Sequence, residues 1–223
     1  MKSQVNSELV EVKIQSSNNQ LYTFSKRFLD IIGALVGIVI TLPVILIFFL
    51  LYKIGDNKGP LFFKQKRIGK NGKIFYIYKF RSMVIDAERK LRENKKLYQK
   101  YVNNNFKLEQ DEDPRITKFG RFIRKTSLDE LPQFINVLKG EMSLVGPRPI
   151  VQEELGEYKN NKDVFLSVKP GITGYWQASG RSEVGYPERV DIELYYVYNK
   201  SFILDIYILI KTIIQVIFRK GAY

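Results

Sequence analysis

The sequence predicts a mainly helical α+β protein, in which a membrane-embedded helix precedes a small folded domain with one short antiparallel β element. Three observations carry this prediction: a 22-residue apolar run without charges at residues 31–52, an alternating aromatic and basic stretch at 59–83, and later segments with helical spacing of apolar residues. A chain of 223 residues suits one domain with an anchor. We expect a polar tail at 1–22, a membrane anchor at 23–53 and a folded domain at 54–223.

The composition limits the chemistry that this domain can perform. The chain has no cysteine and no histidine, which excludes disulfides, thiolate metal sites, cysteine nucleophiles and the usual base at neutral pH. Catalysis must therefore use carboxylates, Lys, Arg, Tyr or Ser. The net charge of +13 indicates a polyanionic partner, which can be nucleic acid, an anionic membrane surface or a phosphorylated substrate.

The apolar run at 31–52 is long enough for a membrane helix, and it follows about thirty mostly polar residues, unlike a cleaved signal peptide. Pro43 favours a kink or break, because proline lacks an N–H and its ring clashes with the preceding turn. Both flanks are basic: Lys26 and Arg27 precede the run, and residues 53–81 hold nine Lys or Arg against a single acid. The length of the run favours a straight span. Because cytoplasmic loops carry excess Lys and Arg, the two basic flanks and Pro43 favour a hairpin with both ends in the cytoplasm, so both topologies remain open.

The next segments indicate a hairpin and two helices. Residues 59–83 alternate aromatic or β-branched residues with Lys and Arg around the turn signal Asn71-Gly72, which predicts a short antiparallel hairpin. Residues 86–101 have the mixed charge of a solvated helix, and a loop follows. Residues 115–125 carry a basic residue at every third position and apolar residues on the other side. This amphipathic helix lies either in the lipid headgroup layer or on the core of the domain.

An acid pair, Asp129 and Glu130, follows this basic helix. Ser127 and Glu130 fit the capping-box pattern, so we expect a helix to begin at Ser127 or, because of Pro132, at Asp129. Either start places Asp129 in the first helical turn. Acids favour helix N-termini, and an acid pair in this position is structural in most proteins.

The cations around the acid pair are also compatible with a chemical role. Arg124 and Lys125 precede the pair, and Arg148 follows it, held between two prolines. A helix N-terminus with these cations can hold phosphate oxygens and keep a carboxylate ionised. An ionised carboxylate beside bound phosphate can hold Mg²⁺ or attack phosphorus.

The C-terminal part of the chain predicts a turn-rich loop and two helices. Residues 169–181 contain three glycines and the only tryptophan, Trp176, which is either a core residue or a ligand contact. Residues 188–198 have the pattern of a helix. Residues 205–218 are strongly apolar but too short to span a bilayer, so we expect an interfacial or core-packing helix.

Four segments in this order resemble the bacterial sugar transferase family, the monotopic polyprenyl-phosphate phosphoglycosyl transferases that initiate exopolysaccharide, capsule and glycan assembly. They are KRFLDIIGALVGIVITLPV, GPLFFKQKRIGKNGKIFYIYKFRSM, DPRITKFGRFIRKTSLDELPQFINVLKGEMSLVGPRP and VKPGITGYWQASGR. The resemblance covers residues 26–205. It implies a re-entrant membrane helix broken at Pro43, with a small catalytic domain on the cytoplasmic face of the bacterial cell membrane. Some relatives have a small polar residue before this proline, where this chain has Leu42.

The resemblance also implies an activity and its residues. The implied reaction transfers a sugar 1-phosphate from a UDP-sugar to polyprenyl (undecaprenyl) phosphate, releases UMP, passes through a covalent aspartyl intermediate and uses Mg²⁺. Asp129 corresponds to the nucleophile and to the Mg²⁺ ligand, and Glu130 to its partner. The implied phosphate-binding residues are Arg124, Arg148, Lys79 and Arg81. The implied nucleotide- or substrate-binding residues are Arg181, Trp176 and Gln177.

Two other classes of protein fit parts of the sequence. A membrane-tethered nucleic-acid binder would use the positive charge, but the chain has no recognised nucleic-acid motif and its cations cluster beside the membrane run. A non-catalytic scaffold of a polysaccharide assembly complex would use the anchor but leave the acid pair without a role. We therefore expect the membrane, a UDP-sugar and polyprenyl phosphate as partners, and no nucleic acid. A homo-oligomer and complexes with other polysaccharide-assembly enzymes are compatible with this interpretation.

Overall fold

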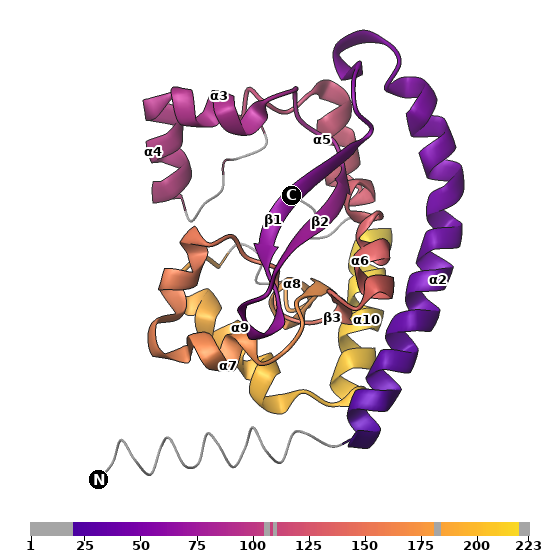
Figure 1. Ribbon diagram of the computed structural model, residues 1–223, viewed down its shortest axis with the longest axis vertical. Helices are drawn as coiled ribbons and strands as arrows, with labels where there is room; N and C mark the ends of the chain where they lie inside the picture. The colour runs from indigo at the N-terminus through magenta and orange to yellow at the C-terminus, as the bar shows by residue number, and fades with distance from the viewer. Residues whose placement is uncertain (1–19, 105–107, 109–110, 181–183, 219–223) are drawn as a thin grey trace.

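Helix α2, Gln20–Leu51, runs along the length of the domain in this computed structural model (Figure 1). The structure describes residues 20–104, 108, 111–180 and 184–218. The apolar run forms one helix of 32 residues that continues through Pro43. In the same turn the Thr41 hydroxyl donates to the carbonyl oxygen of Gly37 at 2.6 Å. The structure therefore shows the apolar helix but not the predicted hairpin.

Strands β1, Phe62–Ile68, and β2, Ile74–Phe80, form the predicted antiparallel hairpin. Their register pairs the first residue of β1 with the last residue of β2. The turn η2, Lys70–Gly72, has positive φ angles at Asn71 (57°) and Gly72 (75°), a conformation that the Asn-Gly pair favours. The prediction of this hairpin is confirmed.

Short helices and turns make up most of the remaining structure. The 3₁₀ turns are η1 (Gly55–Asn57), η3 (Leu128–Glu130) and η4 (Glu153–Asn161). The α-helices are α3 (Ala87–Glu93), α4 (Lys95–Asn103), α5 (Lys118–Lys125), α6 (Gln133–Lys139), α7 (Lys162–Leu166), α8 (Tyr175–Ala178), α9 (Glu188–Asn199) and α10 (Phe202–Ile217). The last two confirm the helices predicted at 188–198 and 205–218.

The segment predicted as one helix at 86–101 is divided into α3 and α4. Asn94 leaves the helical conformation, with φ −90° and ψ 90°, and its side chain accepts a hydrogen bond of 3.1 Å from the backbone N–H of Leu97. An asparagine that caps a helix in this way ends one helix and starts the next. The prediction of a helical segment is confirmed, but its continuity was wrong.

The structure also differs from the prediction around the acid pair. Ser127 has a φ of 56° and makes no capping hydrogen bond, and only the short turn η3 follows it. The next α-helix, α6, begins at Gln133. The capping-box prediction was wrong because the Glu130 side chain accepts a hydrogen bond from Lys79 instead of from the backbone at Ser127.

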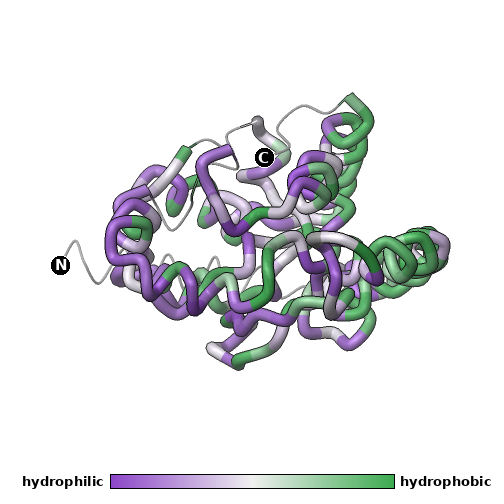
Figure 2. Tube along the Cα trace, turned by 90° about the horizontal axis from the view of Figure 1, so that it is seen from above, coloured by the Kyte–Doolittle hydropathy of each residue, from purple (hydrophilic) through white to green (hydrophobic). Residues whose placement is uncertain are grey.

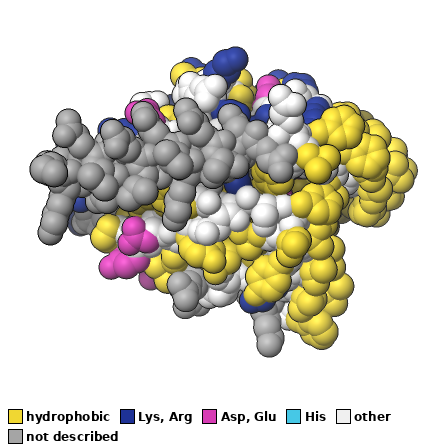
Figure 3. Space-filling model, turned by 90° about the horizontal axis from the view of Figure 1, so that it is seen from below, with side chains coloured by type: hydrophobic (Ala, Val, Ile, Leu, Met, Phe, Trp, Pro, Cys, Tyr) yellow, Lys and Arg dark blue, Asp and Glu magenta, His cyan; other side chains and the backbone are white. Residues whose placement is uncertain are grey.

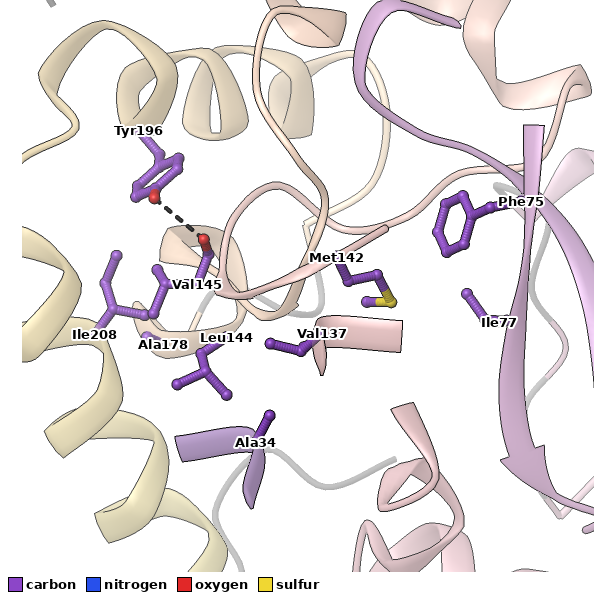
Figure 4. Close-up of a cluster of buried hydrophobic side chains, with 10 residues drawn as sticks. All are labelled: Ala34, Phe75, Ile77, Val137, Met142, Leu144, Val145, Ala178, Tyr196 and Ile208. Atoms are coloured by element: carbon purple, nitrogen blue, oxygen red, sulfur yellow. Dashed lines mark hydrogen bonds between the residues drawn. The ribbon is translucent and has the colours of Figure 1, made fainter. Parts of the chain in front are cut away.

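A second small sheet lies against the main hydrophobic core. It pairs β3, Ser143–Val145, in parallel with β4, Gly171–Thr173. The buried core residues, drawn in Figure 4, are Ala34, Phe75, Ile77, Val137, Met142, Leu144, Val145, Ala178, Tyr196 and Ile208. The Tyr196 hydroxyl donates to the carbonyl oxygen of Val145 at 3.2 Å (Figure 4). Since Ala34 belongs to α2, the apolar helix is part of the core of the domain.

Helix α2 is attached to the domain at both ends and in its middle. Near its start, Lys26 Nζ lies 2.8 Å from Oδ2 of Asp205 in α10. In its middle, Asp30 accepts two hydrogen bonds of 2.8 Å from the start of β3. Near its end, the rings of Phe48 and Phe80 lie 4.9 Å apart between centroids. The domain therefore lies alongside the helix instead of hanging from one end of it.

The outer sides of α2 and α10 are apolar and exposed. Figure 2 shows hydrophobic residues concentrated along α2, with hydrophilic residues on the opposite side at α3 and α4. Seen from below, hydrophobic side chains gather over the side that carries α2 and α10 (Figure 3). Ile203 in α10 is 81% exposed. Within the described residues, α2 is the single helix long and apolar enough to cross a membrane.

Candidate active site

The acid pair lies in η3, between α5 and α6, beside the end of strand β2. Asp129 is buried, with 6% exposure, whereas the side chain of Glu130 is 36% exposed. Helix α5 approaches the chain after β2 very closely at Gly120, where a Cβ atom would lie 1.8 Å from the carbonyl oxygen of Ser82. Only glycine permits this contact. The contact between Gly120 and Ser82 fixes α5, and with it η3, against the end of the hairpin.

Lys79, near the end of β2, connects the two carboxylates. Its Nζ lies 2.6 Å from Oε1 of Glu130 and 4.0 Å from Oδ2 of Asp129. The structure thus brings this predicted phosphate-binding residue to the acid pair. With a side chain 23% exposed, its ammonium group remains partly accessible to an anion.

The two carboxylates differ in their affinity for protons. Burial raises the pKa of Asp129 to about 6; the positive charge of Lys79 opposes this rise, and the negative charge of Glu130 adds to it. Burial also opposes ionisation of Glu130, but the charge and hydrogen bond of Lys79 outweigh it, so the pKa of Glu130 lies below its ordinary value. At pH 7 both groups are mainly ionised, and Asp129 is the one that protonates first.

Arg124, in the last turn of α5, has free donors beside the acid pair. Its Nε donates to Oγ of Ser82 at 2.8 Å, and its terminal nitrogens have no hydrogen-bond partner among the described residues. Burial lowers the pKa of Arg124, and the nearby charge of Asp129 acts in the opposite direction. A guanidinium held by one nitrogen can present the other two to a phosphate.

Arg81, two residues after Lys79, has different surroundings. Its guanidinium donates to the carbonyl oxygens of Pro60 at 2.8 Å, Met83 at 3.0 Å and Asn57. The side chain is buried, and the guanidinium carbon lies 5.1 Å from the centre of the Tyr52 ring. These contacts join the segment after α2 to the end of β2. They leave Arg81 less suited than Arg124 to bind a phosphate.

Arg148 lies after β3, and its charge acts on the acid pair. Its backbone N–H donates to Oε1 of Glu193 at 3.2 Å, and its guanidinium carbon lies 5.9 Å from the ring centre of Trp176. Its charge is close enough to lower the pKa of Glu130. Within the described part of the chain, no group accepts a hydrogen bond from its guanidinium. The structure therefore brings Arg148 toward the site with its donors available.

Trp176 is a core residue that supports two arginines. It is 1% exposed, its Nε1 donates to the carbonyl oxygen of Val184 at 3.1 Å, and the guanidinium of Arg189 lies 4.4 Å from the ring centre. The neighbouring Gln177 has a buried Oε1 atom without a hydrogen-bond partner in the described residues. Arg181, the third predicted nucleotide-binding residue, lies outside the described residues.

Arg67 of β1 is a cation near the site that the sequence did not single out. It acts on the pKa of Glu130 together with Arg148. Its side chain is 11% exposed, and its terminal nitrogens contact Glu154 at 3.5 Å and Gln65 at 2.6 Å. In the hairpin register Arg67 pairs with Phe75, which places it on the same face as Lys79. Period-two counting along the two strands was the signal that could have identified it.

Asp129 and Glu130 are the residues that could hold a magnesium ion here. Mg²⁺ commonly uses one or two carboxylates and completes its coordination with substrate phosphates and water. Among the described residues, no group of three or more acidic or other metal-binding side chains is present. The acid pair fits a Mg²⁺ ion that is also bound by a phosphorylated substrate.

Comparison with known proteins identifies relatives over most of the chain. The bacterial sugar transferase family model matches residues 21–219. Undecaprenyl-phosphate galactose phosphotransferase of Salmonella typhimurium is 47% identical over 220 residues, which are 96% of this chain and 45% of that protein. Exopolysaccharide production protein ExoY of Sinorhizobium fredii is 41% identical over 203 residues, which are 89% of this chain and 88% of that protein. Galactosyl transferase CpsE of Streptococcus agalactiae is 46% identical over 202 residues, which are 90% of this chain and 44% of that protein.

The chain spans about half the length of the first and third of these relatives and most of the length of ExoY. The residues matched to the family include the acid pair, its surrounding cations and nearly all of the apolar helices α2 and α10. The chain therefore belongs to the bacterial sugar transferase family.

Proposed function

We propose that the protein transfers a sugar 1-phosphate from a UDP-sugar to polyprenyl phosphate and releases UMP, as the first step in the assembly of a surface polysaccharide. The observation that carries this proposal is the acid pair held by Lys79 beside the free donors of Arg124. The proposed reaction agrees with the name of one relative, undecaprenyl-phosphate galactose phosphotransferase. Both substrates present phosphates to the nucleophile, and cations with free donors can bind them.

We place a covalent intermediate on Asp129. A carboxylate oxygen of Asp129 attacks the β-phosphorus of the UDP-sugar, the bond from that phosphorus to the bridging oxygen breaks, and UMP leaves with the electron pair. The sugar 1-phosphate is then an acyl phosphate on Asp129. An oxygen of polyprenyl phosphate attacks the same phosphorus in the second step and releases Asp129. The chain has no Cys or His to act as the nucleophile, and the buried carboxylate of Asp129 lies beside Lys79.

The cations have separate roles in this scheme. Lys79 keeps both carboxylates ionised at neutral pH, because its positive charge lowers the pKa of each of them. Arg124 and Arg148 bind phosphate oxygens through their free donors and orient the phosphorus toward Asp129. Mg²⁺ held by the acid pair would neutralise charge on the diphosphate when the donor is bound.

We also propose that the protein is monotopic and lies on the cytoplasmic face of the membrane. A helix of 32 residues is about 48 Å long, which exceeds the roughly 30 Å of a bilayer core. Because both ends of α2 contact the same domain, an upright helix would carry the charged side of that domain into hydrocarbon. This cost is avoided if α2 enters the bilayer from one side only and α10 lies at the membrane interface. A bend at Pro43 within the bilayer would serve the same purpose.

Cysteine labelling tests this topology. Cysteines introduced at positions 10 and 60 should both be protected from an impermeant reagent added outside spheroplasts. Labelling at position 10 alone would show that α2 spans the membrane. Replacement of Pro43 by Ala should increase the labelled fraction at position 10, because a helix without proline resists bending.

Release of UMP tests the activity. The purified chain is incubated with Mg²⁺, undecaprenyl phosphate and, one at a time, UDP-hexoses and UDP-N-acetylhexosamines. We expect UMP release and a sugar diphospholipid product with at least one donor. A non-catalytic scaffold would release no UMP with any of them while still remaining bound to the membrane.

A further inference from the structure

Two cations, Arg27 and Lys169, lie together at the end of α6, and the charge of Lys70 acts on both Lys169 and Lys200. We call Arg27, Lys70, Lys169 and Lys200 the basic cluster. A Cβ atom on Gly140 would lie 3.5 Å from Nζ of Lys169 and 3.7 Å from Nη2 of Arg27, so these two cationic groups lie within about 7 Å of each other. Lys70 belongs to the hairpin turn and Lys200 to the connection between α9 and α10.

The charges of this cluster are poorly balanced by the protein. Arg27 donates to the carbonyl oxygens of Val137 and Leu138 at 2.8 and 2.9 Å, at the end of α6. For Lys70, Lys169 and Lys200, the described residues provide no carboxylate within ion-pair distance. Asp30, the acid that acts on Lys169, already accepts two hydrogen bonds from β3.

Mutual repulsion within the basic cluster follows from this arrangement. Burial, followed by the charges of Arg27 and Lys70, lowers the pKa of Lys169. Burial, followed by the charge of Lys70, also lowers the pKa of Lys200. Half-buried lysines that repel one another gain stability from a bound anion.

The position of the basic cluster indicates which anion it meets. Arg27 lies among exposed apolar residues of α2, between Phe24, 72% exposed, and Phe28, 60% exposed. Lys200 lies just before α10, whose exposed apolar surface starts with Phe202 and Ile203. Figure 1 shows that the start of α2 and the start of α10 lie near the same end of the molecule. Cations at the border between a polar domain and two apolar helices lie at the level of lipid headgroups.

Lys70 of the basic cluster and Lys79 of the candidate active site lie at opposite ends of the β1–β2 hairpin. Strand β2 begins at Ile74, next to the turn that holds Lys70, and Lys79 lies five residues further along it. At about 3.4 Å per residue, Lys79 is roughly 17 Å from the start of the strand. Lys70 therefore cannot contact a phosphate that lies between Lys79 and Asp129.

We propose that the basic cluster binds the phosphate of an anionic phospholipid headgroup and thereby holds the starts of α2 and α10 at the membrane surface. The acyl chains of this lipid would lie along the exposed apolar sides of the two helices, which a free phosphate ion could not use. This proposal depends on the membrane association proposed above but not on the transferase reaction.

Native mass spectrometry of the full chain in a neutral detergent can test the proposal. Phosphatidylglycerol and phosphatidylcholine are titrated separately onto the wild type, onto a triple variant with Lys70→Gln, Lys169→Gln and Lys200→Gln, and onto a control with Lys90→Gln, Lys95→Gln and Lys96→Gln. The control removes the same charge from exposed positions in and around α3 and α4. We expect the triple variant to lose affinity for phosphatidylglycerol by on the order of tenfold or more, since each basic residue near a membrane contributes about 1 kcal/mol.

Three results would overturn the proposal. The triple variant could bind phosphatidylglycerol like the wild type, the control could lose as much affinity as the triple variant, or excess inorganic phosphate could displace the lipid completely, which would indicate a general anion site. If the triple variant does not give a folded monodisperse protein, the single variants Lys169→Gln and Lys200→Gln replace it, each with an expected loss of about fivefold. Asp129→Asn should bind phosphatidylglycerol like the wild type, so failure of the proposed reaction and failure of this proposal can be distinguished.

Discussion

The two ends of the β1–β2 hairpin present positive charge in two different settings. At the end of β2, Lys79 lies 2.6 Å from Glu130 and within 4.0 Å of Asp129. At the turn, Lys70 joins the basic cluster, where its charge acts on the pKa of Lys169 and Lys200 and no described carboxylate pairs with it. Cations that lie beside carboxylates can keep a nucleophilic carboxylate ionised and can bind its substrate. Cations that have no carboxylate beside them can only bind an anion.

Asp129→Asn should produce the largest change, because it removes the nucleophile and makes the carboxylate end of the hairpin unable to react. Before lipid is added, the wild type with Mg²⁺, unlabelled UDP-sugar and labelled UMP should move label into the UDP-sugar, since formation of the aspartyl intermediate is reversible. The variant should lose this exchange by at least about a thousandfold, because an amide is a poor nucleophile and a poor Mg²⁺ ligand.

Glu130→Gln is the matched comparison for this exchange, and it should retain part of the rate. A wild type that turns over normally with lipid but shows no exchange would contradict the covalent route. Direct transfer between the two substrates would then remain, with Asp129 limited to binding metal.

Lys79→Met should produce the next largest effect, because it leaves the acid pair without its nearest cation. Lys79 lowers the pKa of both carboxylates, so its removal should raise both values and shift the acidic limb of the pH–rate profile upward. Activity at pH 7 should fall by about 100-fold, and raising the pH should recover part of it. The profile is measured for UMP release. An unchanged acidic limb would show that Lys79 does not control the ionisation of the pair.

Local sequence signals predicted those parts of the fold that depend on neighbouring residues. The Asn71-Gly72 turn and the alternation around it were sufficient for the hairpin, because both the turn type and the strand faces are local properties. The capping-box prediction at Ser127 failed because Lys79, distant in sequence, takes the Glu130 side chain. The path of α2 along the domain could not be predicted either, since it rests on contacts such as Lys26 with Asp205.

The same distinction applies to the site. The resemblance to the family implied phosphate binding for both Arg81 and Arg124, which lie in different segments of the sequence. In the fold, carbonyl oxygens take the donors of Arg81, whereas Arg124 keeps its terminal nitrogens free of protein partners in the described residues. Arg67 could have been identified from the alternation along the two strands, because the register of the hairpin places it on the face of Lys79.

Arg124→Lys and Arg148→Lys keep the positive charge but remove the planar pair of donors. If both arginines bind donor phosphates, each variant should lose roughly 1.5 to 3 kcal/mol of transition-state stabilisation, or about 10- to 100-fold in kcat/KM. The steady-state rate of UMP release measures this loss. Near-normal kinetics in both variants would show that charge alone is needed at this end of the hairpin, as we expect at the other.

Arg81→Lys should change stability more than turnover, because lysine cannot reproduce the hydrogen bonds to three carbonyl oxygens. The free energy of unfolding should fall by about 1 to 3 kcal/mol. Thermal unfolding in neutral detergent measures this change. Arg121→Lys, at an exposed position of α5, is the control and should leave the unfolding temperature unchanged. If the variant bound the UDP-sugar more weakly but kept its stability, Arg81 would instead belong to the phosphate-binding residues.

The smallest effect concerns the cost of the buried charge on Asp129. Its pKa rises from an ordinary value of 3.8 to about 6 in the fold, so between these pH values the folded protein binds more protons than the unfolded chain. Stability should therefore fall as the pH rises through this window, and above it Asp129 should contribute little further change.

Asn at position 129 does not titrate, so Asp129→Asn should be more stable than the wild type at pH 7, by about 2 kcal/mol or less. This advantage should disappear below pH 4, where the wild-type carboxyl is protonated in both states. Unfolding measured across this pH range at constant ionic strength and without Mg²⁺ tests the prediction. An Asn variant that is less stable than the wild type at every pH would show that the cations around Asp129 more than offset the cost of burying its charge.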